Sequence, residues 1–363
     1  MKNSSSYKIT FALALLFVTY TTEAQLISDE HISKNFNCID CNLKSTTLNS
    51  HKTLRINFHF ISRSDGTGNF GESTNIFGNT SSENGYWISD LLINQANNYL
   101  ANNVEMTQQL SYSPIPVEEI KYSYKLNGVF FHKNDSFYEC YFAPNSLTNN
   151  IGCAINIFIF AGRSGNGAAY YDACWIGGIE SSYSDYIANS NTWHLTRRAN
   201  ILNHEIGHIL SLDHPKRSPG GLKSTIGGTQ YTDNCNDTPT FMELINDGYS
   251  DPYQWCNGEY SNNIMDYSCQ LRAFTPCQIN QVHSYIECCF TSYLYGNYQN
   301  SHVQINNFSE NMAYIAEIVE IPTGASITIP NSKKLYIDAQ ELIINGEFFV
   351  PLGSTFEFTP YGL

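Results

Sequence analysis

The stretch HEIGHILSLDH, residues 204–214, constrains the fold more than any other part of the sequence. It overlaps the end of a segment, 193–212, whose apolar residues recur at helical spacing, which predicts one helix. On that helix His204 and His208 project from one face, one turn apart, so both imidazoles can reach one metal ion. His214 supplies a third ligand if the helix ends before it and the backbone turns. The fourth position then stays open for water, as a catalytic zinc requires.

Glu205 gives such a metal site a reaction to perform. Zinc held by neutral histidines lowers the pKa of its water to about 7, and an adjacent carboxylate can accept that proton as the water attacks a carbonyl. The pattern predicts peptide hydrolysis without a covalent intermediate. The alternative is chance, since average composition produces His-Glu-x-x-His in roughly one chain in a hundred of this length.

The eleven residues resemble the metzincin signature HExxHxxGxxH, with one departure. Ser211 stands where family members usually have glycine, in a backbone conformation that costs serine roughly 1 kcal/mol. Further along, NIMDY at residues 263–267 is similar to the metzincin methionine turn. Cys269 and FTPCQ at 274–278 follow it, and this order resembles the pappalysin and cytophagalysin branch. The resemblance covers about residues 51–292.

This resemblance implies a zinc metalloendopeptidase with assigned roles for its residues. The three histidines of the motif would hold zinc, and Glu205 would be the general base. Met265 would form an apolar floor below the metal. Tyr267 would stabilise the oxyanion on the attacked carbonyl, as a phenol donor can, with simple packing as the alternative role.

A second metal is suggested by DNCNDTP at residues 233–239, which is similar to the DxVxDTP segment of the same branch. There, oxygen ligands bind structural calcium, so the resemblance makes Asp233, Asp237 and Thr238 candidate calcium ligands. An Asx-type turn is an equal alternative.

Substrate preference is not carried over by the resemblance. Well-known members place an acidic residue shortly after the methionine-turn tyrosine, whereas Ser268 and Cys269 follow here. Glu259 or Asp266 could substitute, and the cleaved sequence stays open.

The N-terminal residues predict export and a latent precursor. Residues 1–24 have two lysines, an apolar core and a small-residue end, which is the pattern of a secretory signal peptide. Residues 25–50 are a candidate pro-segment with Cys38 and Cys41. Either thiolate could bind the zinc as a cysteine switch, and a disulfide is the alternative.

The mature chain keeps eleven cysteines, an odd number, so at least one thiol lacks an intramolecular partner. Bridges among Cys235, Cys256, Cys269 and Cys277 would fix the methionine turn, although their pairing cannot be deduced. The neighbours Cys288 and Cys289 should bond to different partners.

Charge and composition argue against some classes of binding partner. The net charge is −14 and no Lys/Arg-rich run is present, which argues against nucleic acid. No later segment is long and apolar enough to insert stably in a membrane. We expect a secreted monomer that acts on a polypeptide, with zinc as cofactor and calcium as a candidate.

The fold class we expect is α+β. A metzincin-like catalytic domain at 51–292 would combine a mixed twisted sheet, a backing helix at 87–97, the active-site helix and a methionine-turn subdomain. LRINFHFIS, residues 54–62, alternates like a half-buried strand, and 154–161 is another strand. An exposed edge strand near Gly167 to Tyr171 would pair with extended substrate. Residues 300–363 suggest a small β-rich C-terminal module with a weak 29-residue repeat, too weak to indicate a solenoid.

Two other functions compete with the peptidase. A non-catalytic adhesin or binding protein could keep zinc for structure on a metzincin scaffold. A hydrolase with the same site could act on something other than polypeptide.

Overall fold

The structure of the chain is a computed structural model. The residues that it describes are 51–140, 153–162, 167–170, 173–190, 193–215, 225–226, 229–230, 233, 235–239, 241–249, 261–266, 271–296, 302–309, 312–331 and 333–360. The predicted signal peptide, the pro-segment with Cys38 and Cys41, Tyr267, Cys256, Cys269 and Glu259 lie outside these residues. Within them, no helix is both long and apolar enough to cross a membrane.

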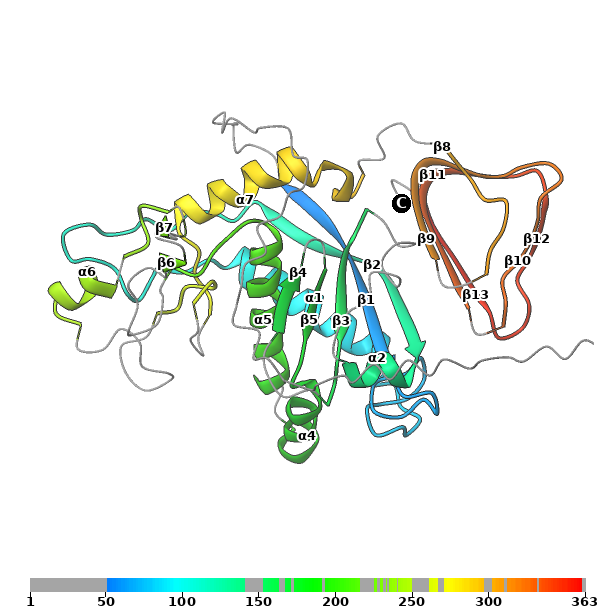
Figure 1. Cartoon of the computed structure of the whole chain (residues 1–363), viewed down its shortest axis with the longest axis horizontal. Helices are drawn as coiled ribbons and strands as arrows, with labels where there is room; N and C mark the ends of the chain where they lie inside the picture. The colour runs from blue at the N-terminus through cyan, green and yellow to red at the C-terminus, as the bar shows by residue number, and fades with distance from the viewer. Residues whose placement is uncertain are drawn as a thin grey trace, which may run out of the picture. The chain divides into compact units, whose positions relative to one another are not determined.

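The centre of the fold is a five-stranded mixed sheet in the order β2-β1-β3-β5-β4 (Figure 1). Its strands are β1 Lys52–Ser62, β2 Tyr122–Lys133, β3 Ile155–Ile159, β4 Gly167–Tyr170 and β5 Ala173–Ile176. Neighbours pair in parallel except for β4, which runs antiparallel to β5 at the edge of the sheet. Parallel neighbours require crossover connections: the one between β1 and β2 contains a helix, and the one between β3 and β5 contains strand β4.

Two helices cover one face of this sheet. Helix α1, Gly85–Ala101, begins where the Asn84 side chain accepts the backbone N–H groups of Tyr86 and Trp87. Helix α5, Trp193–Ile209, carries the histidine motif. Both helices pack apolar residues against the even-numbered side chains of β1, in one core. The predicted backing helix and active-site helix are therefore present.

The opposite face of β1 corrects the prediction of a half-buried strand. Arg55, Asn57 and His59 are fully buried, although they alternate with apolar residues as a solvent-facing set would. They are covered because polar partners from other segments face them. The alternation correctly separates the two faces but does not indicate exposure.

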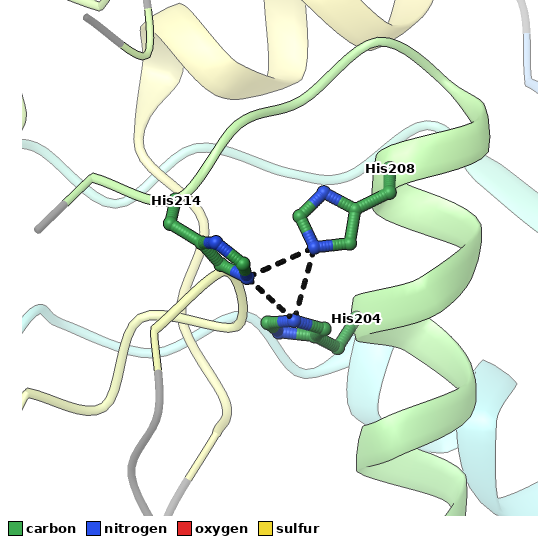
Figure 2. Close-up of side chains that lie close together, drawn as sticks. All are labelled: His204, His208 and His214. Carbon is green, nitrogen blue, oxygen red and sulfur yellow. Dashed lines mark hydrogen bonds between the residues drawn. The ribbon is translucent and has the colours of Figure 1, made fainter. Parts of the chain in front are cut away.

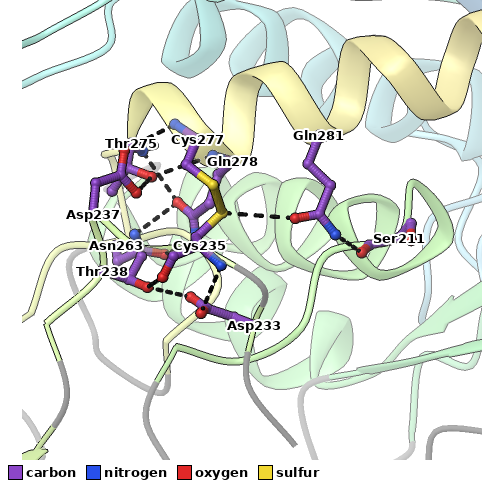
Figure 3. Close-up of a disulfide and its surroundings, with 10 residues drawn as sticks. All are labelled: Ser211, Asp233, Cys235, Asp237, Thr238, Asn263, Thr275, Cys277, Gln278 and Gln281. Carbon is purple, nitrogen blue, oxygen red and sulfur yellow. Dashed lines mark hydrogen bonds between the residues drawn. A yellow bond between two sulfur atoms is a disulfide. The ribbon is translucent and has the colours of Figure 1, made fainter. Parts of the chain in front are cut away.

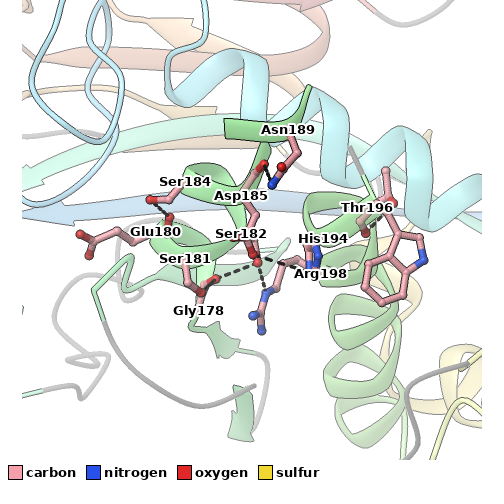
Figure 4. A network of polar contacts seen from close by, with 11 residues as sticks. Gly178, Glu180, Ser181, Ser182, Ser184, Asp185, Asn189, His194, Thr196 and Arg198 are labelled. Atoms are coloured by element: carbon pink, nitrogen blue, oxygen red, sulfur yellow. Dashed lines mark hydrogen bonds and ion pairs between the residues drawn. The ribbon is translucent and has the colours of Figure 1, made fainter. Parts of the chain in front are cut away.

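The remaining helices surround this core. They are α2 Asp135–Cys140, α4 Ile179–Asn189, α6 Phe241–Asn246, α7 Pro276–Cys289 and the 3₁₀ turn η1 Thr291–Tyr293. Strand β6, Thr225–Ile226, pairs antiparallel with β7, Thr229–Gln230. Figure 4 shows how α4 is tied to α5: Arg198 Nε donates to Ser182 Oγ at 2.9 Å. Gly178, in the left-handed region at φ 66°, precedes α4, and a Cβ there would meet the Arg198 guanidinium.

The sequence TPCQ at residues 275–278 has the pattern of a helix start, and helix α7 begins there. Thr275 caps it, Pro276 occupies the first turn, and Gln278 completes a capping box with Thr275. The Asp237 carboxylate adds to this cap because it accepts Thr275 Oγ1–H at 2.7 Å and Cys277 N–H at 2.8 Å. A negative charge is favourable at a helix N-terminus.

The C-terminal residues form a β-rich module with a core of its own. Its strands are β8 His302–Gln304, β9 Met312–Ile321, β10 Ser326–Thr328, β11 Lys334–Ile344, β12 Glu347–Phe349 and β13 Thr355–Pro360. The sheets β13-β11-β9-β8 and β10-β12 are both parallel (Figure 1). Successive strands stack as the coils of a solenoid do. The sequence-based prediction that the β-rich module is not a solenoid is therefore wrong.

The module contacts the central sheet through polar groups. Arg55 Nε donates to Asp338 Oδ2 at 2.9 Å, and both side chains are buried. The backbone N–H of Val129, on the edge strand β2, donates to Tyr336 Oη at 3.1 Å. Strand β11 thus covers part of a sheet edge that would otherwise present unpaired backbone groups.

Candidate metal centre

The three predicted histidines converge on one point (Figure 2). The Nε2 atoms of His204, His208 and His214 lie 3.0–3.1 Å from one another. His204 and His214 are buried and His208 is partly buried. Nitrogen ligands at 2.0–2.1 Å from a tetrahedral zinc would lie about 3.3 Å apart, so the spacing fits one zinc ion.

The hydrogen bonds of the rings determine which nitrogen faces the centre. His204 Nδ1 lies 2.7 Å from the Ile264 carbonyl, and His208 Nδ1 lies 2.8 Å from the Leu212 carbonyl. A carbonyl only accepts, so each Nδ1 carries the proton and each Nε2 of a neutral ring carries a lone pair. Lone pairs that face one another repel without a cation between them. The donor set therefore suits a metal ion, with the two carbonyls orienting the ligands.

A tight turn after α5 carries His214 back to the other histidines. Leu212 N–H donates to the Gly207 carbonyl at 2.9 Å and Ser211 N–H to the His208 carbonyl at 3.1 Å, which together form a Schellman motif. Ser211 occupies its left-handed position with φ 74°. The expectation that this position needs a conformation natural to glycine is confirmed.

Glu205 lies on α5 beside the histidines and is buried. Strand β4 passes close to it, since a Cβ at Gly167 would lie 2.6 Å from Glu205 Oε1. Only glycine allows the edge strand this approach without moving the carboxylate. The carboxylate and the edge strand are thus neighbours.

Met265 is fully buried beneath the helix, where a Cβ at Gly207 would collide with its Sδ. The turn that carries Met265 is held by an amide pair: Asn263 Nδ2 donates to Gln278 Oε1 at 2.8 Å, and Gln278 Nε2 donates to Asn263 Oδ1 at 3.2 Å. Asn263 Oδ1 also accepts Met265 N–H at 2.9 Å. Helix α7 therefore anchors the same turn whose Ile264 carbonyl orients His204.

The three candidate calcium ligands lie close together (Figure 3). Asp233 Oδ1 accepts Cys235 N–H at 3.2 Å, which is the Asx-type turn of the alternative interpretation, and Asp233 Oδ2 accepts Thr238 Oγ1–H at 2.5 Å. Burial raises the pKa of Asp233 to about 6. Asp237 points to the α7 N-terminus. These contacts serve the fold by themselves, and calcium stays a prediction.

Cys235 and Cys277 form a disulfide, which joins this loop to α7 (Figure 3). The sulfurs lie near Asp237, but bonded sulfurs are not thiolate ligands, so this cluster is not a second zinc site. Cys288 and Cys289 are also disulfide-bonded, and Cys153 is a free thiol.

Sequence reasoning missed the residues that support the site. Asn263 and Gln278 each stand in a recognisable motif of the sequence, but neither motif indicates that the two side chains pair. Gln281, whose Nε2 donates to the Ser211 carbonyl at 2.6 Å, carries no sequence signal that distinguishes it from any polar residue on a helix.

A histidine delivered by a turn to two others on a helix, above a buried methionine, defines a metzincin-type metallopeptidase site. Residues 142–287 match the family model Peptidase_M43, described as pregnancy-associated plasma protein-A. The match over these residues supports a pappalysin-like metzincin. Metallopeptidases of this family use zinc, and a peptidase family implies a polypeptide substrate.

Other comparisons add little. No curated protein matches the chain. A solved structure described as "Structure of a chaperone-substrate complex" shares 11% identity over 68% of this chain, with a TM-score of 0.29. The chain spans about a third of that structure, 35% of its length.

Proposed function

We propose that the chain is a secreted zinc metalloendopeptidase. The observation that carries the proposal is the convergence of three histidine Nε2 atoms beside the buried Glu205 carboxylate. Two of the ligand rings are already oriented by backbone carbonyls, so the centre is organised for a metal before one binds.

In the proposed mechanism each residue has one task. His204, His208 and His214 hold zinc, which when bound polarises a substrate carbonyl and lowers the pKa of water to about 7. Glu205 accepts the proton from the attacking water and later donates it to the leaving amine. Its buried position excludes bulk water from that transfer. We assign to Tyr267 the hydrogen bond that stabilises the oxyanion.

The substrate is proposed to bind as an added strand along β4. Among the described residues β4 pairs only with β5, so its other edge can take an extended peptide. Because Gly167 of this strand abuts Glu205, a peptide paired here would run past the general base. Main-chain pairing would supply affinity with little dependence on the side chains.

The deciding experiment compares the purified chain with Glu205→Gln for zinc content and for cleavage of casein or gelatin. We expect about one zinc per chain in both, and a fall in cleavage of at least about a thousandfold in the variant. A zinc chelator should inhibit the parent. Glu341→Gln, which changes an exposed carboxylate on β11, is the matched control and should cleave normally.

Two results would reject the mechanism in different ways. Normal cleavage by Glu205→Gln would remove Glu205 from the reaction. Zinc without cleavage of any polypeptide, even after residues 25–50 are removed, would favour the non-catalytic zinc-containing binding protein.

Calcium, latency and export are further parts of the proposal. Calcium bound at Asp233, Asp237 and Thr238 should raise the melting temperature of the parent but not of Asp233→Asn. A switch through Cys38 or Cys41 predicts that replacing that cysteine by serine gives activity without removal of the pro-segment. Mass spectrometry of the protein from culture medium should find Gln25 as the first residue.

A further inference from the structure

Helix α7 supports the metal centre through residues that face the loops bearing the ligands. Gln281 follows Cys277 by four positions and Gln278 by three, so its side chain lies on the same side of the helix as theirs. Cys277 bonds to Cys235, Gln278 pairs with Asn263 of the methionine turn, and Gln281 reaches the turn after α5 (Figure 3). The contact between Gln281 and the turn after α5 is not explained by the roles of the disulfide or of the methionine turn.

The turn at Ser211 needs outside support. Serine is disfavoured in the left-handed conformation that this residue adopts, and its side chain is exposed. Two ligands depend on the turn, because the Leu212 carbonyl orients His208 and the chain beyond Leu212 delivers His214. A turn that relaxed toward an ordinary serine conformation would move both.

Gln281 contacts the turn at its backbone. Its Nε2 donates to the Ser211 carbonyl at 2.6 Å, while its Oε1 lies 3.6 Å from Cys235 Sγ. The sulfur is in a disulfide and has no proton to donate, so the carbonyl contact fixes which end of the amide faces the turn. Since α7 is anchored by the disulfide one turn earlier, the amide is held in place.

We propose that Gln281 is a positioning residue for the metal centre, which holds Ser211 in the left-handed turn through its carbonyl and thereby sets the approach of His208 and His214. The inference rests on the proposed zinc site. It also explains how serine can occupy this position. The hydrogen bond from Gln281 restrains Ser211 in the left-handed conformation, which glycine would adopt without such a restraint.

The test is a double-mutant cycle on the full chain, read as the zinc dissociation constant in competition with a chromophoric chelator. Gln281→Ala should weaken zinc binding about tenfold or more in the Ser211 chain, as loss of a group that orients ligands does. In the Ser211→Gly chain the same change should leave affinity within about twofold of its background. Gln281→Glu, which cannot donate, should behave no better than Gln281→Ala.

Controls separate positioning from general stability. Asn280→Ala, on the exposed face of the same helix, should leave zinc affinity unchanged. The melting temperature of each zinc-free variant shows whether a loss of affinity is only unfolding. Recovery of affinity in Gln281→Ala/Ser211→Gly cannot arise from a defect in α7 itself.

Each adverse result has one meaning. Zinc binding by Gln281→Ala equal to that of the parent overturns the positioning role while leaving the peptidase proposal intact. Weak binding that Ser211→Gly fails to restore overturns the link to the serine turn. A parent chain that binds no zinc rejects the proposed function, and the inference with it.

Discussion

The two faces of the central sheet achieve burial by different means. On β1 the even-numbered residues Leu54, Ile56 and Phe58 pack against the helices that bear the metal centre. The odd-numbered Arg55 and His59 are equally buried but require polar partners. Apolar packing tolerates small shifts, whereas an unpaired buried polar group is costly. The metal centre therefore lies on the face with apolar packing, and the contacts most sensitive to substitution lie on the other face.

The polar face is a chain of named contacts. His59 Nε2–H donates to Asn156 Oδ1 at 3.0 Å, and His59 Nδ1 then accepts His132 Nε2–H at 3.0 Å. Asn156 Oδ1 also accepts from Asn57 Nδ2 at 3.3 Å. Arg55 is paired with Asp338 from the C-terminal module. The module therefore completes the fold of the sheet.

The largest expected effect comes from breaking the buried ion pair. Asp338→Ala leaves the Arg55 guanidinium without its carboxylate, which should lower the free energy of unfolding by about 3–5 kcal/mol. Urea denaturation measures this. The zinc dissociation constant of the folded variant should not change, because the pair lies on the face away from the centre. The apolar double variant Arg55→Met/Asp338→Leu should recover most of the stability, and equal losses in both variants would contradict the argument.

Removing the disulfide should affect both stability and the metal. The bond joins residues 42 apart, and its loss through Cys235→Ser/Cys277→Ser should cost about 4 kcal/mol by loop entropy. Unlike Asp338→Ala, this variant should also bind zinc more weakly, since the bond anchors α7 to the loop beside the centre. Unchanged zinc affinity in the folded variant would show that the disulfide, like the Arg55–Asp338 pair, contributes to stability but not to the metal centre.

Acid should act on the polar face. Burial lowers the pKa of His132 to about 4, with the nearby Lys333 charge adding to the shift, and burial followed by the His132 charge lowers the pKa of His59 well below its usual value. The unfolded chain therefore binds more protons than the folded chain, and the free energy of unfolding should fall as pH drops from about 6.5 to about 4. At about 1.4 kcal/mol per unit of pKa, His132 contributes up to about 3 kcal/mol of this loss.

Urea denaturation against pH, with and without His132→Gln, isolates that contribution. Both proteins keep the other histidines, including those of the metal centre, so the difference between the two curves belongs to the His59–His132 pair. Parallel curves over this pH range would show that the pair is not the acid-sensitive element.

Local patterns predicted the parts of this structure that are local. The spacing within α5, the TPCQ signature of the α7 cap and the three histidines each lie within about a dozen residues of sequence, and the structure contains the elements they predict. Tyr267 and the candidate switch cysteines lie outside the described residues and stay predictions.

Long-range partners could not be predicted. Arg55 and Asp338 are 283 residues apart, and His59 and His132 are 73 apart. Alternation in one strand shows which residues share a face but not what covers that face. The solenoid was missed for a related reason: its strands pair at offsets of 23 and 21 residues, whereas the repeat visible in the sequence has an offset of 29. The turn motif therefore repeats with a different period from that of the coils.

The smallest expected effect concerns the backbone conformation of Ser211 alone. Ser211→Gly should stabilise the zinc-free chain by about 1 kcal/mol, since glycine adopts the left-handed region that serine avoids. Its greater freedom in the unfolded chain offsets part of that gain. The exposed Ser211 hydroxyl makes no hydrogen bond to any residue that the structure describes, so its removal breaks none of those contacts. A loss of stability in urea denaturation would show that the Gln281 contact already removes the strain, and that the packed face is less tolerant than its apolar residues suggest.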